Sequence, residues 1–169
     1  GNDFVCMKYE DVCQYNLKIF SKFICDRHFG IGADGLILLG TSKIADCKMR
    51  IFNNDGTEAE MCGNGIRCIA KYIYEKNIIK KERIAIETLA RIKEVEYKLE
   101  NQKIMALKVN MGVPELDISK LPIYTPNNYK HKEKKCKIMI KAQDKEFLGL
   151  FLSVGNPHTV IEVKELKDF

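Results

Sequence analysis

The sequence lacks the cysteine and histidine spacings that hold a structural zinc ion. Its seven cysteines form no CxxC pair and no cluster with histidine. Their odd number and irregular spacing also argue against a disulfide framework. Because the N-terminal residues do not resemble a secretory signal, we expect reduced thiols in a cytoplasmic protein, with no bound metal.

Two further absences concern membranes and nucleic acids. No apolar run approaches the roughly 20 residues that cross a bilayer. The net charge is +5, and much of it lies in residues 129–145, which hold seven lysines and no arginine. Nucleic-acid surfaces usually mix arginine and aromatic residues with lysine, so we interpret this stretch as a solvated strand edge or loop. Neither a membrane nor a nucleic acid is expected as a partner.

The first half of the chain shows hydrophobic patterns of both strands and helices. Strands are expected at residues 3–9, 35–40 and 47–53, and helices at 15–27 and 62–77. Each helix should bury one apolar stripe. The residues of these stripes are Leu17, Phe20, Phe23 and Ile24 in the first helix, and Ile66, Ile69, Ala70 and Ile73 in the second.

Later in the chain, apolar and charged residues alternate as in half-buried strands. Residues 94–100 and 103–111 are joined by two residues and predict a β-hairpin. Its inward-facing side chains should be Val95, Tyr97 and Leu99 on one strand, and Met105, Leu107, Val109 and Met111 on the other. Antiparallel strands with few helices indicate an α+β fold.

A domain boundary is expected where glycine and proline interrupt this alternation. Residues 111–122 carry that interruption, so we predict a first domain over 1–112 and a second over 113–169. In the second domain, strands are predicted at 137–141, 146–154 and 159–163.

The stretch GIGADG at residues 30–35 matches the glycine pattern of dinucleotide-binding proteins. That site requires a strand before the glycines and a helix after them, whereas here a helix precedes and a strand follows. We therefore expect no nicotinamide or flavin cofactor. A tight turn with positive φ angles, close to a site, explains the glycines better.

Cys62 is the most unusually placed thiol of the chain. It precedes Gly63-Asn64-Gly65 and stands where the helical pattern begins. The first turn of a helix carries unpaired N–H groups and partial positive charge, which favour a thiolate and lower the pKa of a cysteine. Gly63 and Gly65 should leave this backbone bare, so that a substrate carboxylate could approach it. Cys68, six residues on, is interpreted as a small core residue.

Two groups of polar residues accompany this thiol. In residues 153–160, Asn156 and His158 flank a proline turn between two strands, where they could hold a polar ligand or tune a neighbour's ionisation. Asn2, Asn53 and Asn64 lie at strand ends, turns or the glycine corner. Their amides are neutral donors and acceptors suited to an ammonium–carboxylate substrate.

Taken together, these motifs resemble the diaminopimelate epimerase family. The matching segments are GNDF (1–4), DRHFGIGADGL (26–36), RIFNNDGTEAEMCGNGIRC (50–68), NMGVPEL (110–116) and SVGNPHTV (153–160). They occur in order and span nearly the whole chain. The combination of CGNG with the preceding FNNDG segment is the most specific part.

The resemblance implies a cofactor-independent epimerase that converts LL-2,6-diaminopimelate to the meso form in lysine and peptidoglycan synthesis. Two cysteines on opposite faces of the α-carbon act as base and acid, and Cys62 matches the first of them. His158 matches a residue that tunes the pKa of the cysteines. The positions that match the family's substrate-binding residues are Asn2, Asn53, Gly63, Asn64 and Asn156.

The family resemblance also implies a fold of two similar domains with the site between them. Each is a strongly curved, mostly antiparallel sheet wrapped around a central helix, here about 62–77. The family's opening strand is expected to be cropped at residue 1. The second domain should be incomplete, because no second glycine-flanked cysteine follows residues 153–160 and Cys136 lies in the lysine-rich stretch. A homodimer is compatible with the resemblance.

Three alternatives stay open at this point. A proline racemase-like enzyme also pairs two cysteines, but it typically carries histidine where this chain has Asn64. The chain could instead be a non-catalytic binding module that keeps one half-site. A redox sensor built on Cys62 is a weaker interpretation, because no resolving cysteine is adjacent in the sequence.

Overall fold

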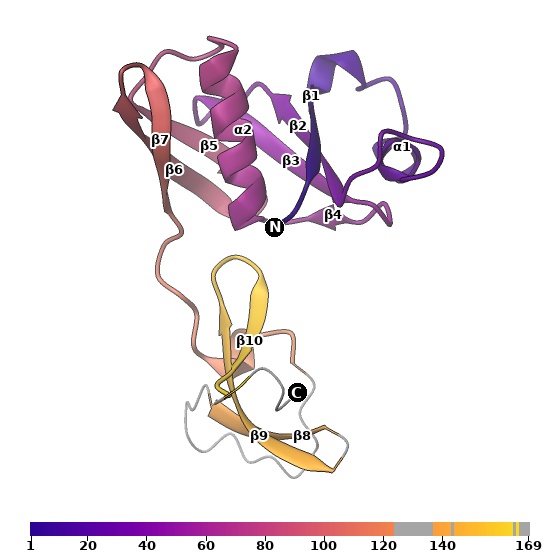
Figure 1. Cartoon of the computed structure of the whole chain (residues 1–169), viewed down its shortest axis with the longest axis vertical. Coiled ribbons are helices and arrows are strands. Elements are labelled where there is room, and N and C mark those ends of the chain that lie inside the picture. The colour runs from indigo at the N-terminus through magenta and orange to yellow at the C-terminus, as the bar shows by residue number, and fades with distance from the viewer. Residues whose placement is uncertain (124–136, 143, 164, 166–169) are drawn as a thin grey trace. The chain divides into compact units, whose positions relative to one another are not determined.

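The chain divides into two compact units, Gly1–Met111 and Gly112–Phe169. The computed structural model, drawn in Figure 1, describes residues 1–123, 137–142, 144–163 and 165. Residues 129–136 of the lysine-rich stretch, Cys136 among them, lie outside this described part. Each unit is described by itself.

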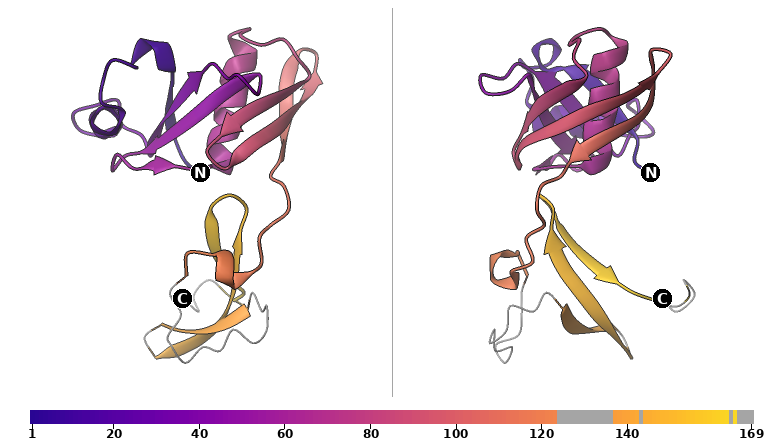
Figure 2. Two further views of the ribbon diagram at one scale, coloured as in Figure 1. Left: turned by 180° about the vertical axis from the view of Figure 1, so that it is seen from behind. Right: turned by 90° about the vertical axis from the view of Figure 1, so that its left-hand side faces the viewer.

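The first unit is built on a seven-stranded mixed sheet. Its strands are β1 (Phe4–Lys8), β2 (Gly35–Gly40), β3 (Cys47–Asn53), β4 (Glu58–Ala59), β5 (Arg83–Thr88), β6 (Arg91–Glu100) and β7 (Lys103–Asn110). Their order is β1-β2-β3-β5-β6-β7, with β4 beside β3. The β1–β2 and β3–β5 pairs are parallel and the others antiparallel. Figure 2 shows the sheet curling around one helix, which agrees with the predicted α+β fold.

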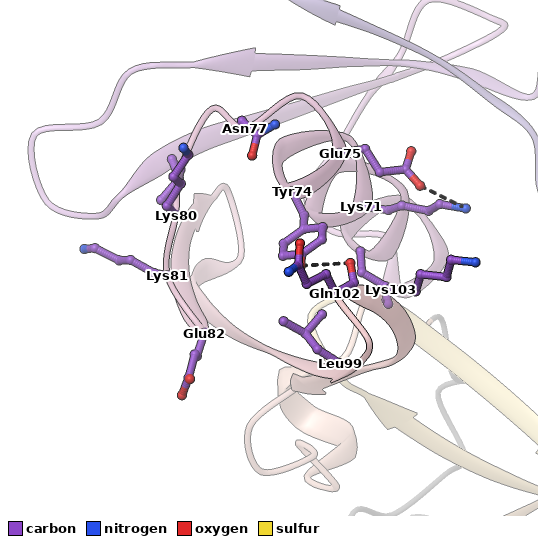
Figure 3. A pocket seen from close by; sticks show the side chains of 12 residues that line it. Lys71, Tyr74, Glu75, Asn77, Lys80, Lys81, Glu82, Leu99, Gln102 and Lys103 are labelled. Carbon is purple, nitrogen blue, oxygen red and sulfur yellow. Dashed lines mark hydrogen bonds and ion pairs between the residues drawn. The ribbon is translucent and has the colours of Figure 1, made fainter.

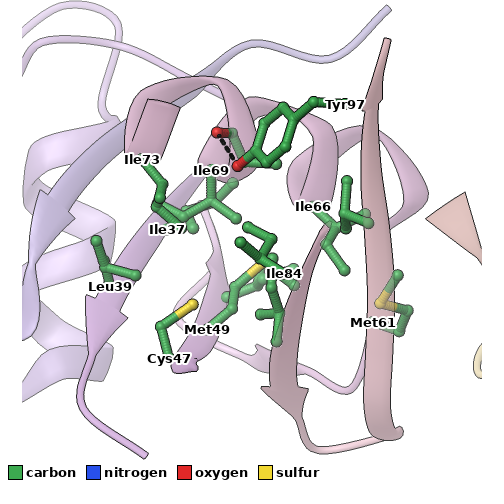
Figure 4. Packing of buried hydrophobic residues seen from close by; sticks show 14 residues of the cluster. Ile37, Leu39, Cys47, Met49, Met61, Ile66, Ile69, Ile73, Ile84 and Tyr97 are labelled. Atoms are coloured by element: carbon green, nitrogen blue, oxygen red, sulfur yellow. Dashed lines mark hydrogen bonds between the residues drawn. The ribbon is translucent and has the colours of Figure 1, made fainter. Parts of the chain in front are cut away.

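That central helix is α2 (Gly63–Glu75), and its apolar stripe forms the middle of the core. All four predicted stripe residues, Ile66, Ile69, Ala70 and Ile73, are completely buried. Figure 4 shows the isoleucines of α2 packed among side chains of β2, β3 and β5. Burying one isoleucine side chain stabilises a fold by about 1.5–3 kcal/mol, so this stripe anchors the helix firmly.

The helix α1 (Leu17–Cys25) covers the opposite face of the sheet. Leu17, Phe20 and Ile24 pack there as predicted, but Phe23 was wrongly assigned to the buried stripe, because it is 60% exposed. The fully buried positions of α1 are Ser21 and Cys25. The packed face is therefore rotated toward small residues, which a count of large apolar side chains misses.

Strand β2 separates these two cores. Leu36 and Leu38 pack on the α1 side, whereas Ile37 and Leu39 pack on the α2 side. Successive side chains of a strand point to opposite faces, so a strand covered on both faces needs a continuous apolar run. This accounts for the sequence GLILLG of β2.

The hairpin of β6 and β7 forms where the sequence predicts it. Asn101 and Gln102 have φ angles of 48° and 62°, as expected for a two-residue turn that matches strand twist. The predicted alternation is wrong at Met105, which is 65% exposed. Leu99 is 41% exposed, although it pairs with Ile104, which packs on the core. The strand register shifts next to Leu99, and Met105 is skipped in the pairing. This bulge exchanges the inward and outward positions of β7 at the tip of the hairpin.

Strands β5 and the short β4 were not predicted from the sequence. The central residues of β5 are apolar, but Arg83 and Glu87 obscure the pattern at its ends. Two 3₁₀ helices, η1 (Tyr9–Asp11) and η2 (Ile118–Lys120), were not predicted either.

The second unit holds η2 and a three-stranded antiparallel sheet. Its strands are β8 (Lys137–Ala142), β9 (Lys145–Ser153) and β10 (Pro157–Ile161), in the order β10-β9-β8. Glu115 and Ser153 exchange backbone hydrogen bonds of 2.8 and 3.0 Å, which tie the NMGVPEL segment to the end of β9. Among the described residues of both units, no helix is long and apolar enough to cross a membrane.

Candidate functional site

The structure places Cys62 at the N-terminus of α2. Its backbone is extended (φ −141°, ψ 117°), and its Sγ accepts a hydrogen bond of 3.3 Å from the N–H of Gly65. The thiol is half-buried, and the adjacent Met61 is fully buried in the core. Sulfur thus occupies the capping position where an oxygen usually accepts from the first turn.

The two glycines beside Cys62 have different roles. A methyl group on Gly63 would meet no atom closer than the Met111 Cε at 4.0 Å, so this backbone is open. A methyl group on Gly65 would lie 3.1 Å from the Ile37 Cδ1, inside the core. The expectation of a bare backbone therefore fits Gly63 only, whereas Gly65 is small because α2 packs closely against β2.

Asn64 and Asn2 lie together beside the start of α2. Asn64 Nδ2 donates a hydrogen bond of 2.9 Å to Asn2 Oδ1, and Asn2 Nδ2 donates one of 3.1 Å to Asp34 Oδ2. Arg67, one turn into the helix, donates to Asn64 Oδ1. The fold thus joins residues from the N-terminus, the glycine-rich turn and the CGNG segment.

Asp34 is in turn held by a guanidinium group. Arg27 donates bonds of 3.0 and 2.9 Å to the two carboxylate oxygens of Asp3, and one of 2.9 Å to Asp34 Oδ1. The backbone N–H of Asp34 also donates to Asp3 Oδ1 at 3.0 Å. Hydrogen bonds from Arg27 lower the pKa of the Asp3 carboxyl to about 2. The Asp3 carboxylate is therefore charged at neutral pH.

The glycine-rich turn between α1 and β2 supplies Asp34. A helix precedes it and a strand follows, so the dinucleotide-binding arrangement is absent from this turn. Gly32 has a φ of 83°, which matches the predicted positive angle. A Cβ on Gly30 would lie 2.2 Å from the carbonyl oxygen of Phe23, so only glycine lets the turn pack against the end of α1.

Asn53 lies at the end of β3, in the turn that leads to β4. Its side-chain Nδ2 donates to Thr57 Oγ1 at 2.9 Å, and its backbone N–H donates to Thr57 O at 2.8 Å. Asp55 Oδ1 accepts from both the N–H and the hydroxyl of Thr57. The amide of Asn53 is therefore oriented by its own turn.

Asn156 and His158 belong to the second unit, and their geometry concerns that unit alone. Asn156 lies in the turn between β9 and β10, where Gly155 adopts a φ of 108°, and His158 is the second residue of β10, paired with Leu152. His158 Nε2 lies 3.1 Å from Asn156 Oδ1. The predicted pair is thus in contact, with the imidazole exposed.

The other described thiols have less favourable settings. Burial raises the pKa of Cys6 to about 11 and of Cys47 to about 12, and it also raises those of Cys25 and Cys68. Cys68 is exposed on α2 despite this partial desolvation, so the expectation of a core residue was wrong. Cys13 is exposed as well.

A pocket of about 870 Å³ lies elsewhere in the first unit. It is formed by the C-terminal end of α2 and the tip of the β6–β7 hairpin, where Tyr74 OH donates to Gln102 O (Figure 3). Lys71, Lys80 and Lys103 line its wall. The sequence-predicted site residues do not line this pocket. In the part of the chain that the structure describes, no group of three metal-binding side chains is found.

Four charged residues that are linked by hydrogen bonds to Asn2, to Asn64 or to one another were not singled out from the sequence. Asp3, Arg27, Asp34 and Arg67 all lie within the quoted motifs, but no role was assigned to them. The sequence signal that could have identified them is a charged residue next to or near Asn2 and Asn64 in the quoted motifs. The partners of Asp3, Arg27 and Asp34 are up to 32 residues away in sequence, so only the fold reveals those pairings, whereas Arg67 contacts Asn64 within one helical turn.

Comparisons with known proteins agree on one family. The model of the family described as diaminopimelate epimerase matches residues 1–116. The diaminopimelate epimerase of Caldanaerobacter subterraneus subsp. tengcongensis is 45% identical over 168 residues, covering 99% of this chain and 59% of that protein. The diaminopimelate epimerase of Methanococcus maripaludis strain C5 is 42% identical, covering 100% of this chain and 59% of its own length. The chain thus spans somewhat less than two thirds of these relatives.

Solved structures share the fold at low identity. A probable proline racemase from Agrobacterium radiobacter K84 superimposes with a TM-score of 0.66 at 13% identity, covering 86% of this chain and 40% of its own. A hydroxyproline epimerase from Agrobacterium vitis gives 0.61 at 16% identity, covering 89% and 40%. These likenesses concern the fold alone. The family model and the identity to the two curated relatives decide the assignment, and this chain belongs to the diaminopimelate epimerase family.

Proposed function

We propose that this chain supplies one half of a cofactor-independent active site that converts LL-2,6-diaminopimelate to its meso form. The proposal rests on the family membership and on one observation, the half-buried thiol of Cys62 capping α2. Inversion at carbon needs a base on one face and an acid on the other. Cys62 is the proposed base, and the acid is a second cysteine supplied by the length that the relatives have beyond this match.

The start of α2 suits the charge that develops when the α-proton leaves. Gly65 N–H is directed at the sulfur, which stabilises a thiolate. Within the described residues, the N–H groups of Gly63 and Asn64 have no acceptor, and the open backbone at Gly63 lets a carboxylate reach them. Preorganised N–H groups in a site closed to water would stabilise the carbanion-like transition state.

The amide side chains are the proposed substrate-binding groups. Asn2, Asn53 and Asn64 in the first unit, and Asn156 in the second, offer donors for carboxylates and acceptors for ammonium groups. His158 contacts Asn156, and we assign it the role of tuning the ionisation of the thiols. No cofactor is needed for this chemistry, and a cytoplasmic location is proposed with it.

A chimera tests the proposal. These 169 residues would replace the matching segment of the Caldanaerobacter relative, which then supplies the remaining length. With LL-diaminopimelate in deuterium oxide, we expect meso product carrying deuterium at the inverted carbon, because a solvent-exchanged thiol delivers the new hydrogen. Chiral chromatography and NMR measure both.

Three controls bound the interpretation. A Cys62→Ala chimera should give no meso product, and L-proline should not be racemised by the active chimera. The 169-residue chain alone should not invert the substrate, since it offers only one competent thiol. A chimera that folds, as judged by circular dichroism, but forms no meso product would contradict the proposed function.

A further inference from the structure

We propose that Arg27, Asp34 and Arg67 are positioning residues that fix which way the amides of Asn2 and Asn64 point at the start of α2. The inference rests on the proposed function for the meaning of those amides, but its structural part stands by itself. The four hydrogen bonds that carry it join Arg67 to Asn64, Asn64 to Asn2, Asn2 to Asp34, and Arg27 to Asp34.

The polarity of this chain of hydrogen bonds is set at its two ends. A guanidinium only donates, so Arg67 requires the oxygen of Asn64 to face it. An ionised carboxylate only accepts, so Asp34 requires the nitrogen of Asn2 to face it. The central bond from Asn64 Nδ2 to Asn2 Oδ1 then satisfies both constraints at once. Turning Asn64 over would oppose two donors at Arg67 and two acceptors at Asn2. Turning Asn2 over would oppose two acceptors at Asp34 and two donors at Asn64.

In this arrangement each amide uses only half of its hydrogen-bonding capacity. In the described part of the chain, Asn2 and Asn64 each keep one N–H and one oxygen lone pair without a partner. An amino acid presents a carboxylate, which accepts, and an ammonium group, which donates. Two amides held in known orientations therefore offer a fixed pattern for these groups beside Cys62, whereas freely rotating amides would not.

Asp34 is held in place, so its carboxylate can serve as the fixed acceptor at one end of this series of hydrogen bonds. Arg27 binds Asp3 through both carboxylate oxygens and reaches Asp34 with the same guanidinium. The backbone of Asp34 is also bonded to Asp3. Because hydrogen bonds from Arg27 lower the pKa of Asp3 to about 2, the ion pair between Arg27 and Asp3 persists across the pH range in which an enzyme works.

The first experiment reads the amides directly in the ¹⁵N-labelled chain. Arg27 does not contact Asn64, so a structural role limited to its own turn would leave the Asn64 side chain unaffected. We expect Arg27→Lys to shift the side-chain NH₂ resonances of both Asn2 and Asn64 and to speed their hydrogen exchange at least about 5-fold. Arg67→Lys, at an exposed helix position, should do the same from the other end.

Arg83→Lys is the matched control. Arg83 also binds a carboxylate, Glu96, at 3.2 Å, but between β5 and β6. This variant should leave both amide signals in place. Unchanged Asn64 signals in both Arg27→Lys and Arg67→Lys would overturn the proposal, and the backbone spectrum of each variant shows whether α2 and the sheet are still folded.

The second experiment separates binding from chemistry in the chimera. Oriented amides bind ground state and transition state alike, so Arg27→Lys should raise the KM for LL-diaminopimelate about 10-fold and change kcat less than about 3-fold. A KM equal to that of the parent chimera would contradict the positioning role. If the chimera has no turnover while the amide signals respond as expected, the proposed function fails and the positioning of the amides stands.

Discussion

The two helices of the first unit begin in chemically different ways. Asn16 caps α1, and its side-chain oxygen accepts from the N–H groups of Lys18 and Ile19 at 3.1 and 3.3 Å. Cys62 caps α2, and among the described residues its sulfur accepts from Gly65 alone. Sulfur is a weak acceptor, so α2 has the poorer cap. Yet α2 is the helix with the fully buried stripe.

This contrast shows where each helix obtains its stability. Only Ser21 and Cys25 of the nine residues of α1 are buried, so its cap contributes a sizeable part of what holds it. The burial of Ile66, Ile69 and Ile73 holds α2 from within. Its first turn is thereby free to carry a weak cap, an open glycine and unpaired N–H groups, which are costly for a helix but useful for binding an anion.

Exchanging the sulfur of the weak cap for oxygen should have the largest effect. In the active chimera, Cys62→Ser should lower kcat at least about 100-fold, since a hydroxyl is a much weaker acid and base at this position. The fold should be intact, because serine is a good helix cap. Steady-state kinetics and urea unfolding of the same protein measure the two effects. Turnover above a tenth of the parent value would refute the assigned role.

The second test compares the same substitution in both helices. Ile69→Ala in α2 removes a completely buried side chain and should lower the free energy of unfolding by about 2–5 kcal/mol. Ile19→Ala in α1 changes a side chain that is 66% exposed and should stay within about 0.5 kcal/mol. Urea unfolding followed by circular dichroism distinguishes them. Equal losses would mean that α2 is not the anchor of the core.

The same contrast shows what could be predicted from the sequence. The stripe of α2 was predicted in full because four residues at helical spacing face one continuous core. In α1, Phe23 also stands at helical spacing and was predicted to be buried. That prediction was wrong, because packing around Ser21 and Cys25 sets the buried face of the helix. Met105 was misplaced because a register shift is a property of two paired strands, not of one.

The candidate site likewise has features that the sequence predicts and features that it does not. The cap position of Cys62 follows from local order, namely a thiol, two glycines and then an apolar helical pattern. The bonds from Asn64 to Asn2 and from Asn2 to Asp34 link segments far apart in the chain, so they depend on the completed sheet. The bond from Arg67 to Asn64 is local and spans one helical turn. Gly65 was misread because its contact with Ile37 exists only after α2 packs on β2.

Alkylation rates test whether the Cys62 thiol, which caps α2 only weakly, is also more reactive than the other thiols. With limiting iodoacetamide near neutral pH, Cys62 should be the first cysteine labelled, about 10-fold faster than the exposed Cys13, because helix N-termini make thiols more reactive. Cys6 and Cys47 should be protected, since burial raises the pKa of these thiols to about 11 and about 12. Peptide mapping by mass spectrometry gives the order. Faster labelling of Cys13 would count against an activated Cys62.

Removing the strong cap should have a smaller effect. Asn16→Ala removes the acceptor for two N–H groups and should lower the free energy of unfolding by about 1 kcal/mol. Cys62→Ala should cost less, because a single weak bond to sulfur is lost. Both values come from urea unfolding of the 169-residue chain. A larger loss for Cys62→Ala would show that the thiol is needed mainly for stability.

The smallest expected effect concerns the two glycines of the weak cap. Gly63→Ala meets open space and should raise the free energy of unfolding by a few tenths of a kcal/mol, because alanine favours the helix by up to about 1 kcal/mol. Gly65→Ala gains the same propensity but pushes its methyl group to 3.1 Å from Ile37 Cδ1, so it should be less stable than Gly63→Ala. Urea midpoints of the two variants decide the order.

In the chimera, Gly63→Ala should nevertheless lower kcat/KM, because the new methyl group stands where a substrate carboxylate would approach the helix start. A Gly63→Ala chimera with unchanged kcat/KM would mean that the open backbone beside Cys62 has no part in binding.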